Sequence, residues 1–205
     1  LEQSQNNIEI EPNDEPSNAF PMAMNIGLQG TLYEDDVDYY SFSVNAPQFV
    51  SIDFSSNSVT ADYQLLLYKG EGENPIDGIN SENGADAGFE VGLTAGTYFL
   101  KLINDGDFEN KSYFLTLTAS DKTNLEIEPN NTFVYANALP KAVQKSGRIY
   151  SANDIDLWGF SLPKQAVFSL GFSSQSFTGD YTVSLLNAAG SVLSQKTSEN
   201  GGGLT

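Results

Sequence analysis

Residues 35–44 read "DDVDYYSFSV" and residues 153–162 read "NDIDLWGFSL", so one strand-like phrase occurs twice. In the first, Tyr40, Phe42 and Val44 alternate with polar residues, a period of two that is typical of a strand with one buried face. The same alternation recurs in "FVSIDFSS" (49–56), "GTYFLKLI" (96–103) and "YFLTLT" (113–118). Gly, Asn, Asp and Pro clusters separate these stretches, as hairpin loops do, and no segment keeps a helical period. An all-β fold of antiparallel strands is predicted.

The repetition extends over most of the second half of the chain. "IEIEPNDEPSNA" (8–19) returns as "LEIEPNNTFVYA" (125–136), and "FSSNSVTADY" (54–63) returns as "FSSQSFTGDY" (172–181). This predicts two tandem β-sandwiches, at 1–119 and 125–205, joined by a linker at 120–124.

The second copy is predicted to be truncated. It stops close to where the first copy begins residues 89–119, which read as the last strands of the unit. We therefore expect the natural protein to continue, or another chain to supply these strands.

Composition excludes several classes of function. The chain has 205 residues, with 27 acidic against 9 basic side chains and a formal charge of -18. Such an acidic surface argues against nucleic acid and anionic membranes, and no apolar run is long enough to span a bilayer. With no His and no Cys, the chain also lacks the usual general base, zinc ligands and disulfides.

The repeated dodecamer favours a hard cation. Glu9, Glu11 and Asn13 alternate along an extended segment, so their side chains point to one side. Like-charged carboxylates repel unless a cation lies among them, and the nearest Lys in the sequence is Lys69. Calcium takes about six to eight oxygen ligands, which carboxylates and amides supply.

A second acidic stretch, "YEDDVDYY" (33–40), accompanies the dodecamer in both copies. Asp36 and Asp38 share a face by alternation, while a bend would instead bring Asp35 to Asp38. The alternative to a metal site is a set of solvated turn acids, since acidic runs usually face water. The duplication of both stretches favours calcium.

The chain resembles the bacterial pre-peptidase C-terminal domain family, which includes the collagen-binding domains of clostridial collagenases. The resemblance rests on "EIEPNDEPSNA", "GTLYEDDVDYYSFSV", "ADYQLLLY", "LTAGTYFLKL" and "YFLTLT". It covers residues 8–119, and then 125–205 until the second copy stops. It implies jelly-roll-like sandwiches with calcium between the acidic segment and an aspartate pair. The implied ligands are Glu9, Glu11, Asn13, Asp14, Asp35 and Asp38 in the first copy, and Glu126, Glu128, Asn130, Asn131, Asn153 and Asp156 in the second.

The first copy is expected to bind calcium better than the second. Asn131 replaces Asp14 and Asn153 replaces Asp35, which removes two negative charges, and ligand charge tunes calcium affinity.

The predicted function is a non-catalytic, calcium-stabilised accessory or binding module of a secreted or cell-surface bacterial protein. It would aid substrate attachment, secretion or stability of an attached hydrolase, with an extracellular protein or polysaccharide as partner. The alternative is a structural spacer repeat of an adhesin or surface protein. Phe99 and Phe114 lie on the faces opposite the buried Tyr98 and Tyr113, and would form an outward binding patch if their strands pair. Catalysis by paired carboxylates is not expected, because the pairs are duplicated in small units with no evident cleft.

Overall fold

The computed structural model describes residues 7–72 and 74–204, which are almost entirely β-structure. The chain divides into two compact units, residues 1–160 and 161–205. The predicted linker at 120–124 therefore lies inside the first unit. Within the described residues, no helix has the length and hydrophobicity needed to cross a membrane.

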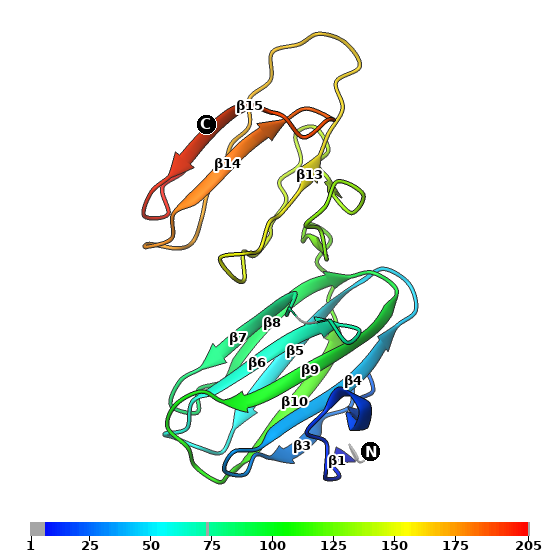
Figure 1. The fold of residues 1–205 in the computed structure, drawn as a ribbon, viewed down its shortest axis with the longest axis vertical. Coiled ribbons are helices and arrows are strands. Elements are labelled where there is room, and N and C mark those ends of the chain that lie inside the picture. The colour runs from blue at the N-terminus through cyan, green and yellow to red at the C-terminus, as the bar shows by residue number, and fades with distance from the viewer. Residues whose placement is uncertain (1–6, 73, 205) are drawn as a thin grey trace. The chain divides into compact units, whose positions relative to one another are not determined.

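The first unit contains a sandwich of two sheets (Figure 1). The five-stranded sheet has the order β2 (Phe20–Pro21), β4 (Val37–Val44), β9 (Gly96–Asn104), β6 (Tyr63–Lys69), β7 (Asp77–Ser81). All of its pairings are antiparallel except the parallel pair β2 and β4. A single 3₁₀ turn, Pro16–Asn18, precedes β2.

The six-stranded sheet faces it. Its order is β1 (Asn7–Ile8), β3 (Leu28–Thr31), β10 (Ser112–Ala119), β5 (Gln48–Ser56), β8 (Ala87–Leu93), β11 (Ile127–Glu128). The two outermost strands each pair in parallel with their neighbour, β1 with β3 and β11 with β8. β1 ends at the first residue of the first dodecamer, and β11 lies within the second. Both acidic segments are thus held at sheet edges.

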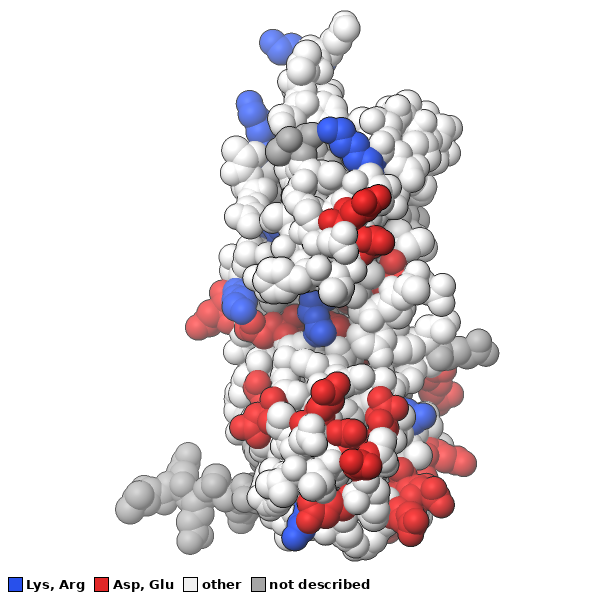
Figure 2. Space-filling view, turned by 90° about the vertical axis from the view of Figure 1, so that its left-hand side faces the viewer, with Lys and Arg blue, Asp and Glu red and all other residues white. Residues whose placement is uncertain are grey.

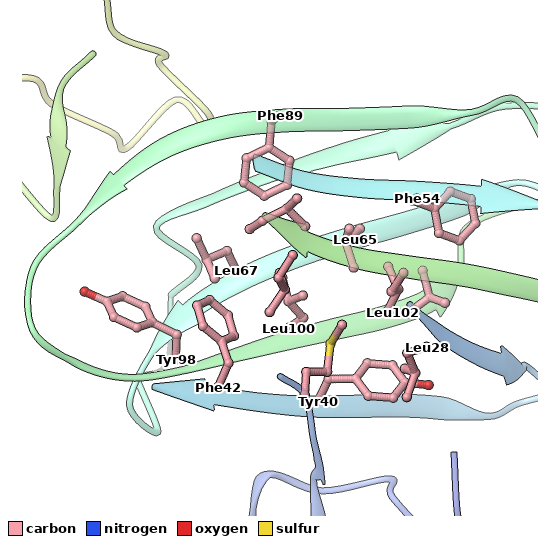
Figure 3. Packing of buried hydrophobic residues seen from close by; sticks show 14 of the residues in the cluster. Leu28, Tyr40, Phe42, Phe54, Leu65, Leu67, Phe89, Tyr98, Leu100 and Leu102 are labelled. Carbon is pink, nitrogen blue, oxygen red and sulfur yellow. The ribbon is translucent and has the colours of Figure 1, made fainter. Parts of the chain in front are cut away.

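The core lies between these sheets and is made of the alternating side chains predicted from the sequence (Figure 3). The predicted inward residues are all buried, namely Tyr40, Phe42, Val44, Val50, Ile52, Phe54, Tyr98, Leu100, Leu102, Tyr113, Leu115 and Leu117. Burial of each large apolar side chain contributes about 1.5–3 kcal/mol.

Strand pairs and bridges after residue 125 join residues equivalent to those that pair in the first sandwich. Among the described residues, β12 (Asn137–Ala138) pairs with β13 (Trp158–Gly159), and β14 (Tyr181–Leu186) pairs with β15 (Val192–Ser198). These repeat β2 with β4 and β6 with β7, 117 or 118 residues later. The single bridges Leu125–Ser146 and Phe172–Leu204 likewise repeat the pairs Ile8–Gln29 and Phe54–Ala87.

The described part of 125–205 does not build a second closed sandwich. It forms two-stranded sheets and isolated bridges. In the first sandwich β4 lies between β2 and β9, and β5 lies between β10 and β8. Among the described residues after 125, the pairings of β4 with β9 and of β5 with β10 have no counterpart. A second sandwich stays a prediction.

Candidate metal centre

The first dodecamer places a carboxylate against two tyrosine hydroxyls. Pairing of β1 with β3 brings Glu9 to the sandwich edge, where its Oε1 accepts the Thr31 amide. Its Oε2 accepts hydrogen bonds from the hydroxyls of Tyr40 and Tyr113, the second at 3.0 Å. Tyr113 also contacts Oδ2 of Asp38. Two buried phenols therefore hold these two carboxylates together.

Three carboxylates meet at this point, which we call the first cluster: Glu9, Glu11 and Asp38. One oxygen of each lies within 4.8 Å of the others, and Asp38 is fully buried. The Asn13 side chain is also fully buried and faces Glu11 and Asp38. With its nitrogen toward them it donates to Asp38 Oδ1 at 3.1 Å and Glu11 Oε2 at 2.9 Å. With its oxygen toward them it would add a ligand to a shared cation.

An equivalent second cluster contains Glu126 and Glu128 of the second dodecamer and Asp156 of the stretch 153–162. One oxygen of each again lies within 4.8 Å of the others. Glu126 and Glu128 are 5% and 2% exposed, and Asn130 beside them is fully buried. The Asn130 side-chain amide donates to Glu126 Oε2 at 3.0 Å, and its backbone amide donates to Glu128 Oε2 at 3.0 Å.

Several buried oxygens of the second cluster have no hydrogen-bond partner. Among the described residues these are Glu128 Oε1, Asn130 Oδ1 and Asp156 Oδ1. Buried polar atoms are nearly always paired, so these three oxygens are available as ligands for a cation. Two oxygens bound to one calcium, each about 2.3–2.6 Å away, lie at most about 5 Å apart. The separations in both clusters fit this limit.

A glycine keeps each cluster open. A Cβ on Gly147 would lie 2.5 Å from Glu126 Oε2 and 2.9 Å from Asp156 Oδ2. A Cβ on Gly30 would lie 2.3 Å from the Tyr113 hydroxyl and 2.5 Å from Glu9 Oε2. A residue with a side chain at either position would have to displace these neighbouring side chains.

Burial without a cation raises the pKa of these acids. The pKa of Asp38 rises to about 8, chiefly by burial, although the Tyr113 hydroxyl opposes the rise. Burial and then the Asp156 charge raise the pKa of Glu126 to about 9. Burial and the charges of Asp154 and Asp156 raise that of Glu128 to about 8, and burial raises that of Asp156 to about 6. A cation would remove this penalty, since it favours the ionised form.

The structure gathers most, not all, of the predicted ligands. Glu9, Glu11, Asn13 and Asp38 come together, and Asp14 forms a further group with Glu11 and Asp36 whose oxygens also lie within 4.8 Å of one another. The corresponding set in the second cluster is Glu126, Glu128, Asn130 and Asp156.

Three predicted ligands, Asp35, Asn131 and Asn153, are exposed, and Asp35 belongs to none of the carboxylate groups of the described residues. Asp35 has a left-handed backbone conformation with φ 60°. Asp36 instead lies in the group with Glu11 and Asp14, so the structure does not place it with Asp38 as the alternation predicted.

The predicted joint patch of Phe99 and Phe114 is wrong. Phe99 lies on β9 of the five-stranded sheet, and Phe114 lies on β10 of the six-stranded sheet. Consecutive strands cross between the sheets here, so the two outward rings lie on opposite faces of the sandwich. Phe99 and Phe114 therefore cannot form one patch.

The second cluster is joined to the first sandwich. The Gly92 amide of β8 donates to the Glu126 carbonyl at 3.1 Å. The backbone amide of Arg148 donates to Glu126 Oε1, while its guanidinium contacts Asp77 Oδ1 at 3.0 Å and donates to the Gly78 carbonyl.

Arg148 also lies 5.2 Å from the centre of the Phe89 ring. It is the only arginine in the sequence, and Thr31 takes its place in the first copy. Sequence reasoning missed its role, although a single arginine in so acidic a chain was a signal.

Comparison with solved structures gives partial likenesses. The pre-peptidase C-terminal domain of a collagenase from Bacillus anthracis is 20% identical, with a TM-score of 0.40 over 51% of this chain and 99% of that chain. The Yersinia pseudotuberculosis-derived mitogen is 20% identical, with a TM-score of 0.36 over 47% and 86%. PliG of Aeromonas hydrophila, a periplasmic inhibitor of g-type lysozyme, is 16% identical, with a TM-score of 0.37 over 56% and 99%. No curated protein matches the chain.

One protein family matches within the first sandwich. The matched residues run from the aspartate pair Asp36 and Asp38 to the end of β9, and so include one side of the first cluster. The resemblance predicted from the sequence is thereby confirmed: residues 36–103 match the family described as the bacterial pre-peptidase C-terminal domain.

Proposed function

We propose that this chain is a non-catalytic, calcium-stabilised accessory module of a secreted bacterial protein, which helps to hold an attached enzyme on an extracellular polymer. The observation that carries the calcium assignment is the second cluster, with buried oxygens that lack partners. The family match over residues 36–103 supports the accessory role.

The two clusters differ in how many hydrogen bonds their carboxylates accept. In the first, Tyr40 and Tyr113 donate to Glu9, and Tyr113 also contacts Asp38. The second cluster has Trp158 at the position of Tyr40, and among the described residues its Glu128 Oε1, Asn130 Oδ1 and Asp156 Oδ1 have no hydrogen-bond partner. We therefore propose that the second cluster is the stronger calcium site. This proposed ranking, based on burial and pairing, is the reverse of the one predicted by counting charges.

Calcium would stabilise the native chain by mass action. At about one hundred times the dissociation constant, the gain is about 3 kcal/mol for each site. Thermal melts in EDTA and in calcium, with isothermal titration calorimetry, test this. We expect calcium to raise the melting temperature and magnesium to act more weakly, because magnesium requires a smaller octahedral site. Identical melting curves and no calorimetric signal would refute the assignment.

The junction between the first sandwich and residues 125–160 favours a second candidate function, a rigid spacer. β11 extends the sheet of the first sandwich, and Arg148 is fixed to Asp77 and Gly78. Sedimentation with insoluble collagen, cellulose and chitin separates the two functions. A calcium-loaded module that binds none of these polymers would support the spacer.

A further inference from the structure

The outer face of the six-stranded sheet carries a shallow hollow of about 340 Å³, away from both clusters. It spans three neighbouring strands, β10, β5 and β8, with Thr116 opposite Asp53 and Asp53 opposite Gly88. Its lining residues are Asp53, Phe54, Ser55, Asp86, Ala87, Gly88, Phe114 and Thr116.

The hollow exists because Gly88 contributes no side chain to the row of outward-facing residues across β10, β5 and β8. Gly88 lies opposite Asp53, and a Cβ there would be 2.9 Å from both Asp53 Oδ1 and the Ile52 carbonyl oxygen. Asp53 Oδ1 therefore lies close to the empty position. Phe114 borders the hollow and lies outside the core, because its neighbours Tyr113 and Leu115 occupy the inner face.

The lining combines an aromatic ring with two exposed carboxylates, Asp53 and Asp86, and includes neither lysine nor arginine. The Ser51 hydroxyl donates to Asp53 Oδ2 at 3.1 Å, which orients this carboxylate. Acidic side chains also gather over the first sandwich on the face seen in Figure 2, in a chain of formal charge -18. An aromatic face next to carboxylates suits a cation, which gains from both the ring quadrupole and the opposite charge.

We propose that this hollow binds a lysine or arginine side chain of a basic peptide segment, with the cationic group on Phe114 and paired to Asp53. The inference rests on the proposed binding function and names its ligand class. A neutral oligosaccharide would also stack on Phe114, but it would leave the two carboxylates without an opposite charge.

The repeated sequence does not conserve the carboxylate of the hollow. At the position of Asp53 the second stretch has Gly171, within "LGFSS" where the first has "IDFSS". The core residues on either side, Ile52 and Phe54, become Leu170 and Phe172, so only the outward residue changes class. The carboxylate of the hollow therefore belongs to the first sandwich alone.

The test measures binding of acetyl-Gly-Arg-Gly-Arg-Gly amide to the full chain in calcium, by chemical shift changes at about physiological ionic strength. We expect saturable shifts centred on β5, β8 and β10, and a dissociation constant raised about fivefold or more by Phe114→Ala and by Asp53→Asn. Phe99→Ala, on the outer face of the opposite sheet, is the matched control and should change it less than twofold. Gly88→Ser should also weaken binding, because its side chain fills the hollow.

Three outcomes would overturn the proposal: no saturable shift at millimolar peptide, equal losses in Phe114→Ala and Phe99→Ala, or shifts caused by xylohexaose but not by the peptide. The melting temperature of each variant is recorded in EDTA and in calcium. A variant that keeps its calcium shift is folded, so failure at the hollow is distinguished from failure of the calcium proposal.

Discussion

Replacing Glu128 with glutamine should have opposite effects with and without calcium. Glu128 is 2% exposed, and its Oε2 accepts the Asn130 amide at 3.0 Å. Glutamine has nearly the same shape and keeps an acceptor for that amide, but it carries no charge. The variant therefore isolates the charge of this buried ligand.

The expected size follows from the pKa. Burial, with the charges of Asp154 and Asp156, raises the pKa of Glu128 from 4.5 to about 8. At pH 7 the metal-free native state therefore holds a proton that the unfolded state has released. Each pH unit above 4.5 costs the native state about 1.4 kcal/mol, so the cost at pH 7 is about 3 kcal/mol.

Glu128→Gln removes this cost, so in EDTA its melting temperature should rise by up to about 10 °C. In calcium the same variant loses a ligand and should melt below the wild type. Circular dichroism melts at pH 7 in both buffers measure the crossover. Glu11→Gln, at an exposed position in the first cluster, is the control and should change the EDTA curve much less. An equal loss of stability in both buffers would refute the reasoning, because Glu128 would then act only as a structural acceptor.

Two further predictions concern pH and the junction. Without metal, stability should fall as pH rises from about 4.5 to about 9, because the raised pKa values of Asp38, Glu126 and Glu128 favour the protonated native state, and the gain from calcium should grow over the same interval. Melts from pH 5 to 9 check this, and a flat EDTA series would contradict it. Arg148→Met leaves the buried Asp77 without its cation and should cost about 1–3 kcal/mol in urea unfolding. Adding Asp77→Asn should recover most of that loss, whereas simple additivity of the two variants would show that the ion pair is not coupled.

The sequence predicted the inner faces of the strands better than their assignment to sheets. Alternation identifies which side of a strand is buried, because successive side chains must point in opposite directions. It does not say which strands pair. β9 and β10 are neighbours in sequence but lie in different sheets, which separates Phe99 from Phe114.

The candidate site was predictable where it depends on local spacing. Glu9 and Glu11 converge because they alternate on one extended segment, and the repeat marks the equivalent pair Glu126 and Glu128. The choice between Asp35 and Asp36 depended on the conformation of one turn. The Tyr113 hydroxyl, 104 residues from Glu9, could be placed only by the closed sandwich.

The pairing of β11 with β8 also affects the tendency of the chain to aggregate through its sheet edge. A free edge strand presents unpaired amides and carbonyls, which recruit strands of other molecules. Here the segment that begins the second repeat covers the edge of the first sandwich at Gly92 and Leu93, and a Cβ on Gly92 would lie 2.3 Å from the Glu126 carbonyl oxygen. Residue 92 must therefore remain glycine for the cover to fit. Protection of this edge from aggregation therefore depends on the segment that follows the sandwich, and not on the strands of the sandwich alone.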